Sequence, residues 1–306
     1  FNELIDASIA RLRGRNIQVY PDFPTGGMVD VSNYNDGLRG GKIRCRAKIV
    51  KHDKKTLIVT EIPFGSTTSS LIDSILKAND KGKIKVKKVE DNTSADVEIL
   101  IHLAPNISPD KMIDALYAFT DCELSISPNS GIIEDKMPKF IGVTAILKRD
   151  TENTKHLLTR ELEIRLGELN EQWHFNSLEK IFIEKRIYRD IEECETWEAV
   201  IKAIDDGLTP YKKLFFREIT EDDIVRLTEI RIKRISKFDS FKADESIRKI
   251  EEEMKKIKFH LENIIDYAVD YYKNLKKKYG ADKQRKTEIR TFENIVASKV
   301  VVANQK

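Results

Sequence analysis

The chain has 306 residues, of which 34% are charged and 40% hydrophobic, and its formal net charge is +3. This length is enough for two domains with buried cores. No apolar run approaches the ~20 residues that a membrane-spanning helix needs, and Cys45, Cys122 and Cys194 are far apart with no CxxC pair. The composition therefore argues against a membrane protein and a disulfide scaffold. It predicts a cytoplasmic protein whose thiols are buried.

The first residues follow a helical pattern, because Leu4, Ile5, Ile9 and Leu12 fall on one face. The chain begins at Phe1, without a methionine and directly in this pattern. We interpret it as a piece of a larger protein, and we expect residues 1–20 to form a connecting helix.

Strand and helix patterns alternate between residues 57 and 127. Their order, β-α-β-β-α-β, predicts an α+β domain of the ferredoxin-like type. An additional strand, Lys42–Ile49, is expected to form a hairpin with the first of these strands across the polar turn near residues 52–54. The expected strands are Leu57–Ile62, Lys83–Val89, Val97–Leu103 and Cys122–Ile126, and the expected helices are Ser66–Ala78 and one that opens at Ser108-Pro109-Asp110.

The additional strand carries a row of cations. Lys42, Arg44, Arg46 and Lys48 alternate with Ile43, Cys45, Ala47 and Ile49. Since successive strand residues point to opposite faces, one face should pack on the domain and the other should present the four cations. Between residues 39 and 55 the chain has eight basic residues and one acidic residue. A polyanion is a natural partner for such a row, and Gly40-Gly41 would let another backbone approach closely.

A second row consists of Lys83, Lys85 and Lys87, opposite Ile84 and Val86. No aromatic residues alternate with either row, which disfavours the stacking of single-stranded bases and favours contacts with the backbone of a duplex. The alternative is an ordinary solvated edge strand, which sheets commonly protect with lysines. The basic strand alone leaves the two interpretations equal.

The C-terminal half contains two long helical patterns. From Asp244 to Tyr279 apolar residues recur at alternating steps of three and four, which is the spacing of a coiled-coil seam, and Gly280 stands where such a helix would stop. An upstream stripe within Thr151–Cys194 supplies an antiparallel partner. The seam consists of Ile247, Ile250, Met254, Ile257, Leu261, Ile264, Ala268, Tyr271 and Leu275, and the stripe of Leu158, Leu162, Leu166, Leu169, Trp173, Leu178, Ile181 and Phe182.

The segment between these helices, residues 195–243, predicts a small all-α knob at the far end of the stalk. A knob of ~45 residues is too small to bury a large core by itself, so we expect it to share burial with a symmetry mate. The residues assigned to this homodimer interface are Ile224, Leu227, Ile230, Ile235 and Phe238.

Motifs for catalysis at a metal or a nucleotide are absent from the sequence. The five histidines show no ligand spacing, and there is neither an HExxH nor a GxxxxGK[ST] motif. The acidic clusters Asp205-Asp206-Gly207 and Glu221-Asp222-Asp223 fall at predicted helix ends, where carboxylates cap a helix and meet its dipole. We assign no catalytic residue, metal or cofactor to this chain.

Several separated segments carry a resemblance to a known family. They are Phe1–Ala7, Pro21–Gly27, Lys42–Ala47, Glu61–Phe64, Leu227–Ser236 and Tyr279–Ile289. Together, and in this order, they resemble the A subunit of bacterial type IIA topoisomerases, the family of DNA gyrase and topoisomerase IV. The resemblance extends over essentially the whole chain.

The resemblance implies a division into parts. Residues 1–20 would connect to a winged-helix domain, 21–149 would form the tower that flanks and bends the cleaved DNA, and 150–194 and 244–280 would form the coiled coil. The knob at 195–243 would be the C-gate, whose homodimer releases the transported duplex. Residues 281–306 would be a linker and the start of a C-terminal β-pinwheel. Within them, Phe292–Lys306 resembles the first strand of that pinwheel.

The resemblance also implies partners and a function. The complete enzyme would be an A2B2 complex near the nucleoid, with ATP and Mg²⁺ on the B subunit, and would pass one duplex through a transient break in another. Topoisomerase IV is favoured over gyrase. Duplex DNA would contact Arg39, Lys42, Arg44, Arg46 and Lys48.

Two departures from the family affect this interpretation. Arg39-Gly40-Gly41-Lys42 stands where the family has Gly-Arg-Gly-Lys. The family's nucleophilic tyrosine follows an arginine in the winged helix, upstream of Phe1, and none of the nine tyrosines here follows an arginine. We therefore expect no cleavage by this chain alone. The alternative function is a coiled-coil dimerisation module with a basic head domain and no enzymatic role.

Overall fold

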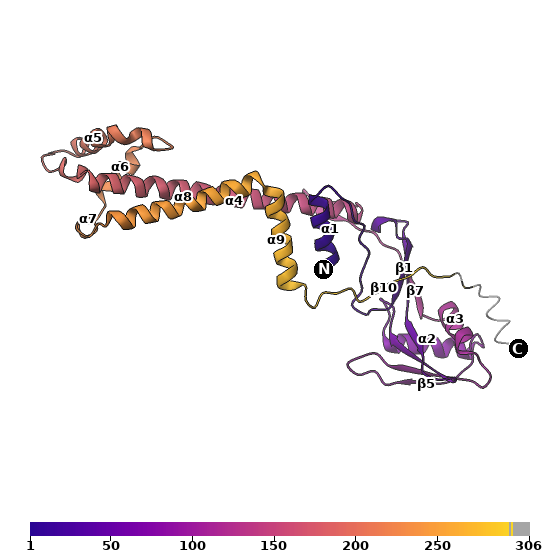
Figure 1. The fold of residues 1–306 in the computed structure, drawn as a ribbon. Helices are drawn as coiled ribbons and strands as arrows, with labels where there is room; N and C mark the ends of the chain where they lie inside the picture. Colours follow the sequence, from indigo (N-terminus) through magenta and orange to yellow (C-terminus); the bar gives the residue numbers. More distant parts are fainter. Residues whose placement is uncertain (294, 296–306) are drawn as a thin grey trace. The chain divides into compact units, whose positions relative to one another are not determined.

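The computed structural model describes residues 1–293 and 295. It is a mixed α/β structure that divides into two compact units (Figure 1). The first unit comprises Phe1–Glu152 and Tyr271–Lys306, and the second comprises Asn153–Asp270. Within the described residues, no helix has the length and apolarity that crossing a membrane requires.

The first unit contains a four-stranded antiparallel sheet in the order β3-β4-β6-β5. The helices α2 (Thr68–Asp80) and α3 (Pro109–Phe119) lie against one side of it (Figure 1). Leu71 and Ile75 of α2 and Leu116 of α3 are fully buried against Leu57 and Ile101 of the sheet. The strands are β3 (Lys48–Lys51), β4 (Thr56–Glu61), β5 (Val86–Asp91) and β6 (Ile99–Leu103).

These helices and three of the predicted strands are confirmed, but the strand expected last, β7 (Glu123–Ile126), does not join this sheet. It pairs with β2 (Lys42–Arg46) in a second sheet, ordered β10-β1-β2-β7. There β2 is antiparallel to β1 (Met28–Asn33), and the short β10 (Glu288–Ile289) runs parallel to β1. The chain turns into β1 at Gly27, whose φ is +76° and where a Cβ would meet the Arg46 carbonyl oxygen at 2.8 Å. Only glycine fits there without strain.

The predicted strand Lys42–Ile49 is two strands that divide at Ala47. Its first part, β2, belongs to the second sheet, and its second part, β3, forms the expected hairpin with β4. Ala47 is fully buried, its N–H donates to the Cys122 carbonyl, and its carbonyl accepts from the Tyr117 hydroxyl. These contacts bend the strand from one sheet into the other, so the residues on either side of Ala47 do not form one continuous face.

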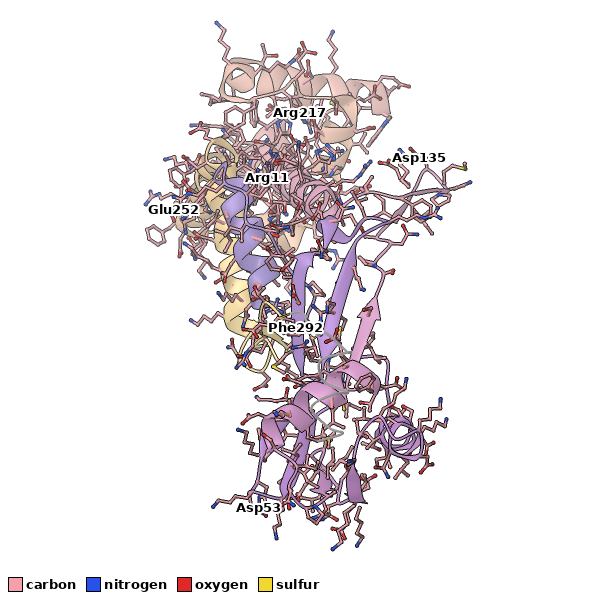
Figure 2. The ribbon with its side chains drawn as sticks, turned by 90° about the vertical axis from the view of Figure 1, so that its right-hand side faces the viewer. Arg11, Asp53, Asp135, Arg217, Glu252 and Phe292 are labelled. Atoms are coloured by element: carbon pink, nitrogen blue, oxygen red, sulfur yellow. The ribbon has the colours of Figure 1, made fainter. Side chains whose placement is uncertain are left out.

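Two turns of the first unit are visible in Figure 2, where Asp53 marks the β3–β4 turn and Asp135 marks a separate hairpin of β8 (Ile132–Glu134) and β9 (Met137–Lys139). Asp135 and Lys136 both have positive φ, as the central residues of a type I′ hairpin turn do. This unit also contains α1 (Asn2–Leu12) and a short 3₁₀ turn at Asn35–Gly37.

The long helix α4 (Val143–Glu184) replaces the predicted helix Thr151–Cys194. It begins earlier because the Asp36 carboxylate accepts from both the backbone N–H and the hydroxyl of Thr144, which caps the helix start. It ends earlier because Arg186 adopts a left-handed conformation, with φ of 56°. A 3₁₀ turn follows at Ile187–Arg189.

The returning helix, which we predicted to be continuous, is interrupted. It consists of α8 (Ser240–Glu262) and α9 (Ile264–Tyr279), which are separated at Asn263 (Figure 1). The Asn263 side-chain amide donates to the Phe259 carbonyl at 2.9 Å, a local bond that competes with the helical pattern. The predicted stop is confirmed, because α9 ends at Tyr279 and the Gly280 N–H bonds to the Lys276 carbonyl.

The two long helices pack against each other in the second unit. Leu162, Leu169 and Trp173 of α4 form a buried cluster with Met254 and Ile257 of α8. The predicted apolar stripes therefore meet, at least up to the break at Asn263. The Trp173 indole N–H adds a polar contact, because it donates to the Glu251 carboxylate at 2.9 Å.

The knob is built on the end of α4. It consists of α5 (Trp197–Leu208), a 3₁₀ segment (Thr209–Leu214), α6 (Glu221–Thr228) and the short α7 (Ile232–Ser236). Leu178 and Phe182 of α4 are buried with Ile224 and Leu227 of α6. Two of the predicted interface residues, Ile224 and Leu227, are thus 3% and 1% exposed within a single chain. The end of α4 supplies the burial that we expected from a symmetry mate.

Candidate nucleic-acid interface

The predicted basic row differs in exposure along its length. Arg39 and Lys42, at the start of β2, are exposed and form no ion pair with any residue among 1–293 and 295. The side chains of Arg44 and Arg46 are 21% and 10% exposed, and that of Lys48 on β3 is 44% exposed. The structure therefore places open cations at the two ends of the row and covers its middle.

The cover is provided partly by Glu123 on β7, which lies directly opposite Arg46 in the sheet. Its Oε1 accepts from Arg44 Nε at 2.7 Å and its Oε2 from Arg46 Nε at 2.6 Å. One carboxylate thus serves two guanidinium groups, and the cluster keeps one positive charge in excess. Lys48 Nζ lies 3.3 Å from the Glu61 carboxylate, a longer and more exposed pair.

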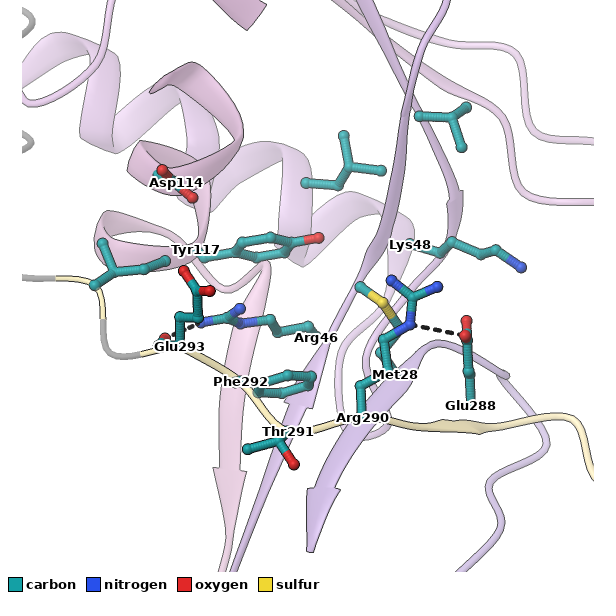
Figure 3. A pocket seen from close by; sticks show the side chains of 13 residues that line it. Met28, Arg46, Lys48, Asp114, Tyr117, Glu288, Arg290, Thr291, Phe292 and Glu293 are labelled. Carbon is teal, nitrogen blue, oxygen red and sulfur yellow. Dashed lines mark hydrogen bonds and ion pairs between the residues drawn. The ribbon is translucent and has the colours of Figure 1, made fainter. Parts of the chain in front are cut away.

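Arg46 is also held between two aromatic rings (Figure 3). Its guanidinium carbon lies 4.6 Å from the ring centre of Tyr117 and 4.2 Å from that of Phe292. Its Nη2 reaches the Glu293 carbonyl at 3.4 Å. These residues line a cavity of about 630 Å³ whose rim includes Lys48 and Arg290. Arg46 is 8% exposed overall, so the cation that we expected to be exposed is packed.

The segment that brings Phe292 to this cavity is tied to the first unit at several points. Arg285 donates to the carbonyls of Tyr20 and Pro21 and pairs with Glu3. The Asp22 carboxylate accepts from the backbone N–H groups of Lys286 and Thr287. Burial alone would raise the pKa of Asp22, but these hydrogen bonds outweigh it and lower the pKa.

The same segment then joins the second sheet. The N–H groups of Glu288 and Arg290 donate to the Gly27 and Val29 carbonyls, and the Phe292 N–H donates to Asp30. Residues 281–293 are thus part of the first unit and not only the linker that we expected. The expected first pinwheel strand falls mostly on residues 294 and 296–306, which lie outside the described part of the chain.

The second basic row is open to solvent. Lys83, Lys85 and Lys87 are exposed, while Ile84 and Val86 between them are buried, which confirms the predicted alternation. The row runs into β5 at the edge of the first sheet. Lys83 additionally lies 5.5 Å from the centre of the Phe119 ring. Unlike Arg44 and Arg46, these three lysines form no ion pair within the part of the chain that the structure describes.

Sequence reasoning missed Glu123, Tyr117 and Phe292. Their positions in the sequence give no signal, because each contacts Arg46 only through strand pairing or helix packing at long sequence separation. Two of the three thiols, those of Cys45 and Cys122, are buried as predicted, whereas Cys194 is only partly buried. Burial raises the pKa of Cys45 to about 11 and that of Cys122 to about 12, so both stay protonated at neutral pH and are poor nucleophiles.

The acidic cluster Glu221-Asp222-Asp223 of the knob caps the start of α6, as predicted. The Thr220 hydroxyl accepts from the Asp223 N–H, and the Asp223 carboxylate accepts from the Thr220 N–H, which forms a capping box. Asp223 also binds Arg217 at 2.6 Å and His174 Nε2 at 3.2 Å, and Arg217 reaches Glu171. In the described residues no group of three or more His, Cys, Asp or Glu side chains is placed to hold a metal ion.

Comparison with known proteins shows the family. A family model that describes the A subunit of DNA gyrase/topoisomerase IV matches residues 1–273. The chain is 35% identical to the A subunit of DNA topoisomerase 4 from Borreliella burgdorferi over all of its 306 residues, which are 49% of that protein. It is 23% identical to the A subunit of DNA topoisomerase 4 from Bacillus subtilis over 99% of the chain and 39% of that protein. It is also 23% identical to the A subunit of DNA gyrase from Brachyspira hyodysenteriae over 88% of the chain and 33% of that protein.

The chain therefore belongs to the family formed by the A subunits of DNA gyrase and topoisomerase IV. It spans about half the length, or less, of the curated relatives that it matches.

Proposed function

We propose that this chain is the DNA-binding and gate-forming part of the A subunit of an ATP-dependent type II DNA topoisomerase, and that the enzyme is a topoisomerase IV. The observation that carries the proposal is the 35% identity to the A subunit of a topoisomerase 4 over the entire chain. In the complete A2B2 enzyme, ATP and Mg²⁺ would bind to the B subunit. The nucleophilic tyrosine would lie in a part of the A subunit that this sequence does not include.

The proposed tower, residues 21–149, binds duplex DNA through its basic strand. Phosphates are contacted by Arg39, Lys42, Arg44 and Lys48. Arg46 does not touch the DNA and instead holds Glu123 and its strand β7 in position. The support for this assignment is the exposure of Arg39 and Lys42 and their lack of carboxylate partners among the described residues. Such contacts position a duplex without reading its sequence.

Binding of a 20-base-pair duplex at several salt concentrations tests this surface. We expect Arg39→Gln with Lys42→Gln to reduce the slope of log K against log salt by ~1.8, since each lost phosphate contact removes ~0.9. The matched control is Lys277→Gln with Lys283→Gln, two exposed lysines in the same unit. If the first pair changes the slope no more than the control, the basic strand is not the DNA contact.

The proposed C-gate is a homodimer of knobs on a coiled coil formed by α4 and the returning helix. Because Ile224 and Leu227 are buried in the knob's own core, we assign the contact to apolar side chains that the knob exposes. Ile232 of α7 and Phe241 at the start of α8 are 83% and 78% exposed. Ile230, Ile235 and Phe238, which the sequence assigns to this interface, pack against the knob's core but are only partly buried, and we assign their exposed parts to the same surface.

A further inference from the structure

The knob has a groove whose cations belong to neither proposed surface, although Ile230 of the proposed gate surface also lines it. It is a cavity of about 660 Å³ between α4 and the α6–α7 region. A neighbouring hollow of about 280 Å³ shares Glu179, Arg234 and Lys237 with it. The cationic lining residues of the groove are Arg226, Arg231, Lys233, Arg234 and Lys237, all within the second unit.

These cations outnumber the carboxylates of the groove. Only Glu179 and Glu229 contribute negative charge to its lining. Glu179 is 4% exposed and is committed to Arg234, whose Nη2 donates to its Oε2 at 2.6 Å. The other four cations of the groove form no ion pair with any residue of the described chain, 1–293 and 295. The groove's lining therefore carries more positive than negative charge, which favours an anion.

Two of the guanidinium groups are held in place before any ligand arrives. Arg226 lies over the Phe175 ring, with 4.0 Å between its guanidinium carbon and the ring centre. Arg234 is anchored on the buried Glu179. A stacked guanidinium keeps its N–H edge available, and this planar edge matches two oxygens of a phosphate. The exposed Lys233 and Lys237 add flexible point charges at the rim.

We propose that this groove binds phosphate groups and that their source is the backbone of a nucleic acid. The choice of source rests on the proposed function, whereas the phosphate chemistry rests on the groove itself. The site is separate from the basic strand, because it lies in the other unit and shares no residue with it. We expect its contacts to go to phosphate oxygens, which position a nucleic acid without reading its sequence.

Salt-dependent duplex binding by the whole chain tests the groove. Lys233→Gln with Lys237→Gln should reduce the slope of log K against log salt by ~1.8. The matched control, Lys255→Gln with Lys258→Gln, removes two exposed lysines of α8 outside the groove and should leave the slope unchanged. If the wild-type chain binds duplex and the groove variant has the same slope as the control variant, the groove proposal is wrong and the proposed function stands. If the wild-type chain does not bind duplex, the proposed function is wrong.

Calorimetric titration with sodium tripolyphosphate distinguishes the source of the phosphate. The wild-type chain should bind this small anion, and Lys233→Gln with Lys237→Gln should weaken its binding at least fivefold. If the variant loses tripolyphosphate but retains the full duplex slope, a nucleic acid is not the occupant. If it binds tripolyphosphate as tightly as wild type, the groove is not a phosphate site.

Discussion

Two carboxylates, Glu123 and Asp223, each contact two basic side chains in this protein. Glu123 binds Arg44 and Arg46, and Asp223 binds Arg217 and His174. Burial would raise the pKa of Asp223, but hydrogen bonds from Arg217 and Thr220 outweigh it and hold the pKa well below its usual range. In each cluster one carboxylate contacts two basic side chains, so its loss would remove both contacts at once.

Replacing Asp223 by Asn should therefore destabilise the second unit strongly. The change removes the charge that pairs with Arg217, alters the acceptor that faces His174 and weakens the cap of α6, which together should cost about 2–4 kcal/mol. Urea unfolding at pH 7.5 measures the loss. Asp222→Asn on the same helix turn is exposed and should cost less than ~0.5 kcal/mol, and equal losses in the two variants would contradict the role given to Asp223.

The buried His174 should make stability depend on pH. It is 2% exposed and faces Asp223, Arg217 and Glu171, and burial together with Arg217 lowers its pKa. Because the unfolded state binds the proton more readily, the stabilisation is complete above pH ~6.5 and is lost as pH falls through the lower folded pKa. Unfolding free energies measured between pH 7.5 and 5 should fall for wild type and fall less for His174→Gln. The exposed His156→Gln should behave like wild type.

At the scale of secondary structure, the sequence predicts those elements whose signals are local. The helices α2 and α3 and the strands β4, β5 and β6 follow from periodicity and capping residues. The division of residues 42–49 at Ala47 does not, because it depends on contacts with Cys122 and Tyr117 from distant parts of the chain. The strand β10 also escaped prediction, since two residues give no pattern and its pairing partner lies about 260 positions away.

The candidate site likewise has features that the sequence predicts and features that it does not. The row of cations is evident from alternation, and Arg39 and Lys42 are exposed as expected. That Arg46 would be covered could not be foreseen, because Glu123, Tyr117 and Phe292 reach it only through tertiary packing. Periodicity assigns a residue to a face, and it contains no information on what packs over that face.

Phe292 should control how firmly β10 is held. Phe292→Ala removes a ring from above Arg46, an interaction of about 0.5–2 kcal/mol, and so loosens the segment that follows Thr287. Hydrogen exchange at the Glu288 and Arg290 amides should become about 2- to 30-fold faster, provided that they exchange by local opening. Thr291→Ala, an exposed neighbour, is the control. Unchanged exchange in Phe292→Ala would show that the backbone pairing alone holds the strand.

At the scale of the whole molecule, the knob depends on the long helix for its core and still exposes apolar side chains. Ile232→Asp with Phe241→Asp should convert a dimer into a monomer, because two charges would be buried in the proposed gate interface. The variant should fold normally, since both side chains are exposed in the single chain. Leu214→Asp, 63% exposed elsewhere on the knob, should leave the dimer intact. A chain with both Ile232→Asp and Phe241→Asp that folds and stays dimeric would place the contact on another surface.

The most direct test of the proposed DNA-binding gate is the molar mass of the complex that the chain forms with a 30-base-pair duplex. Sedimentation equilibrium at low salt gives this mass over a range of protein concentrations. We expect a species with two 35.3 kDa chains and bound duplex. A chain that sediments as a 35.3 kDa monomer and leaves the duplex free, at concentrations of tens of micromolar, would contradict it.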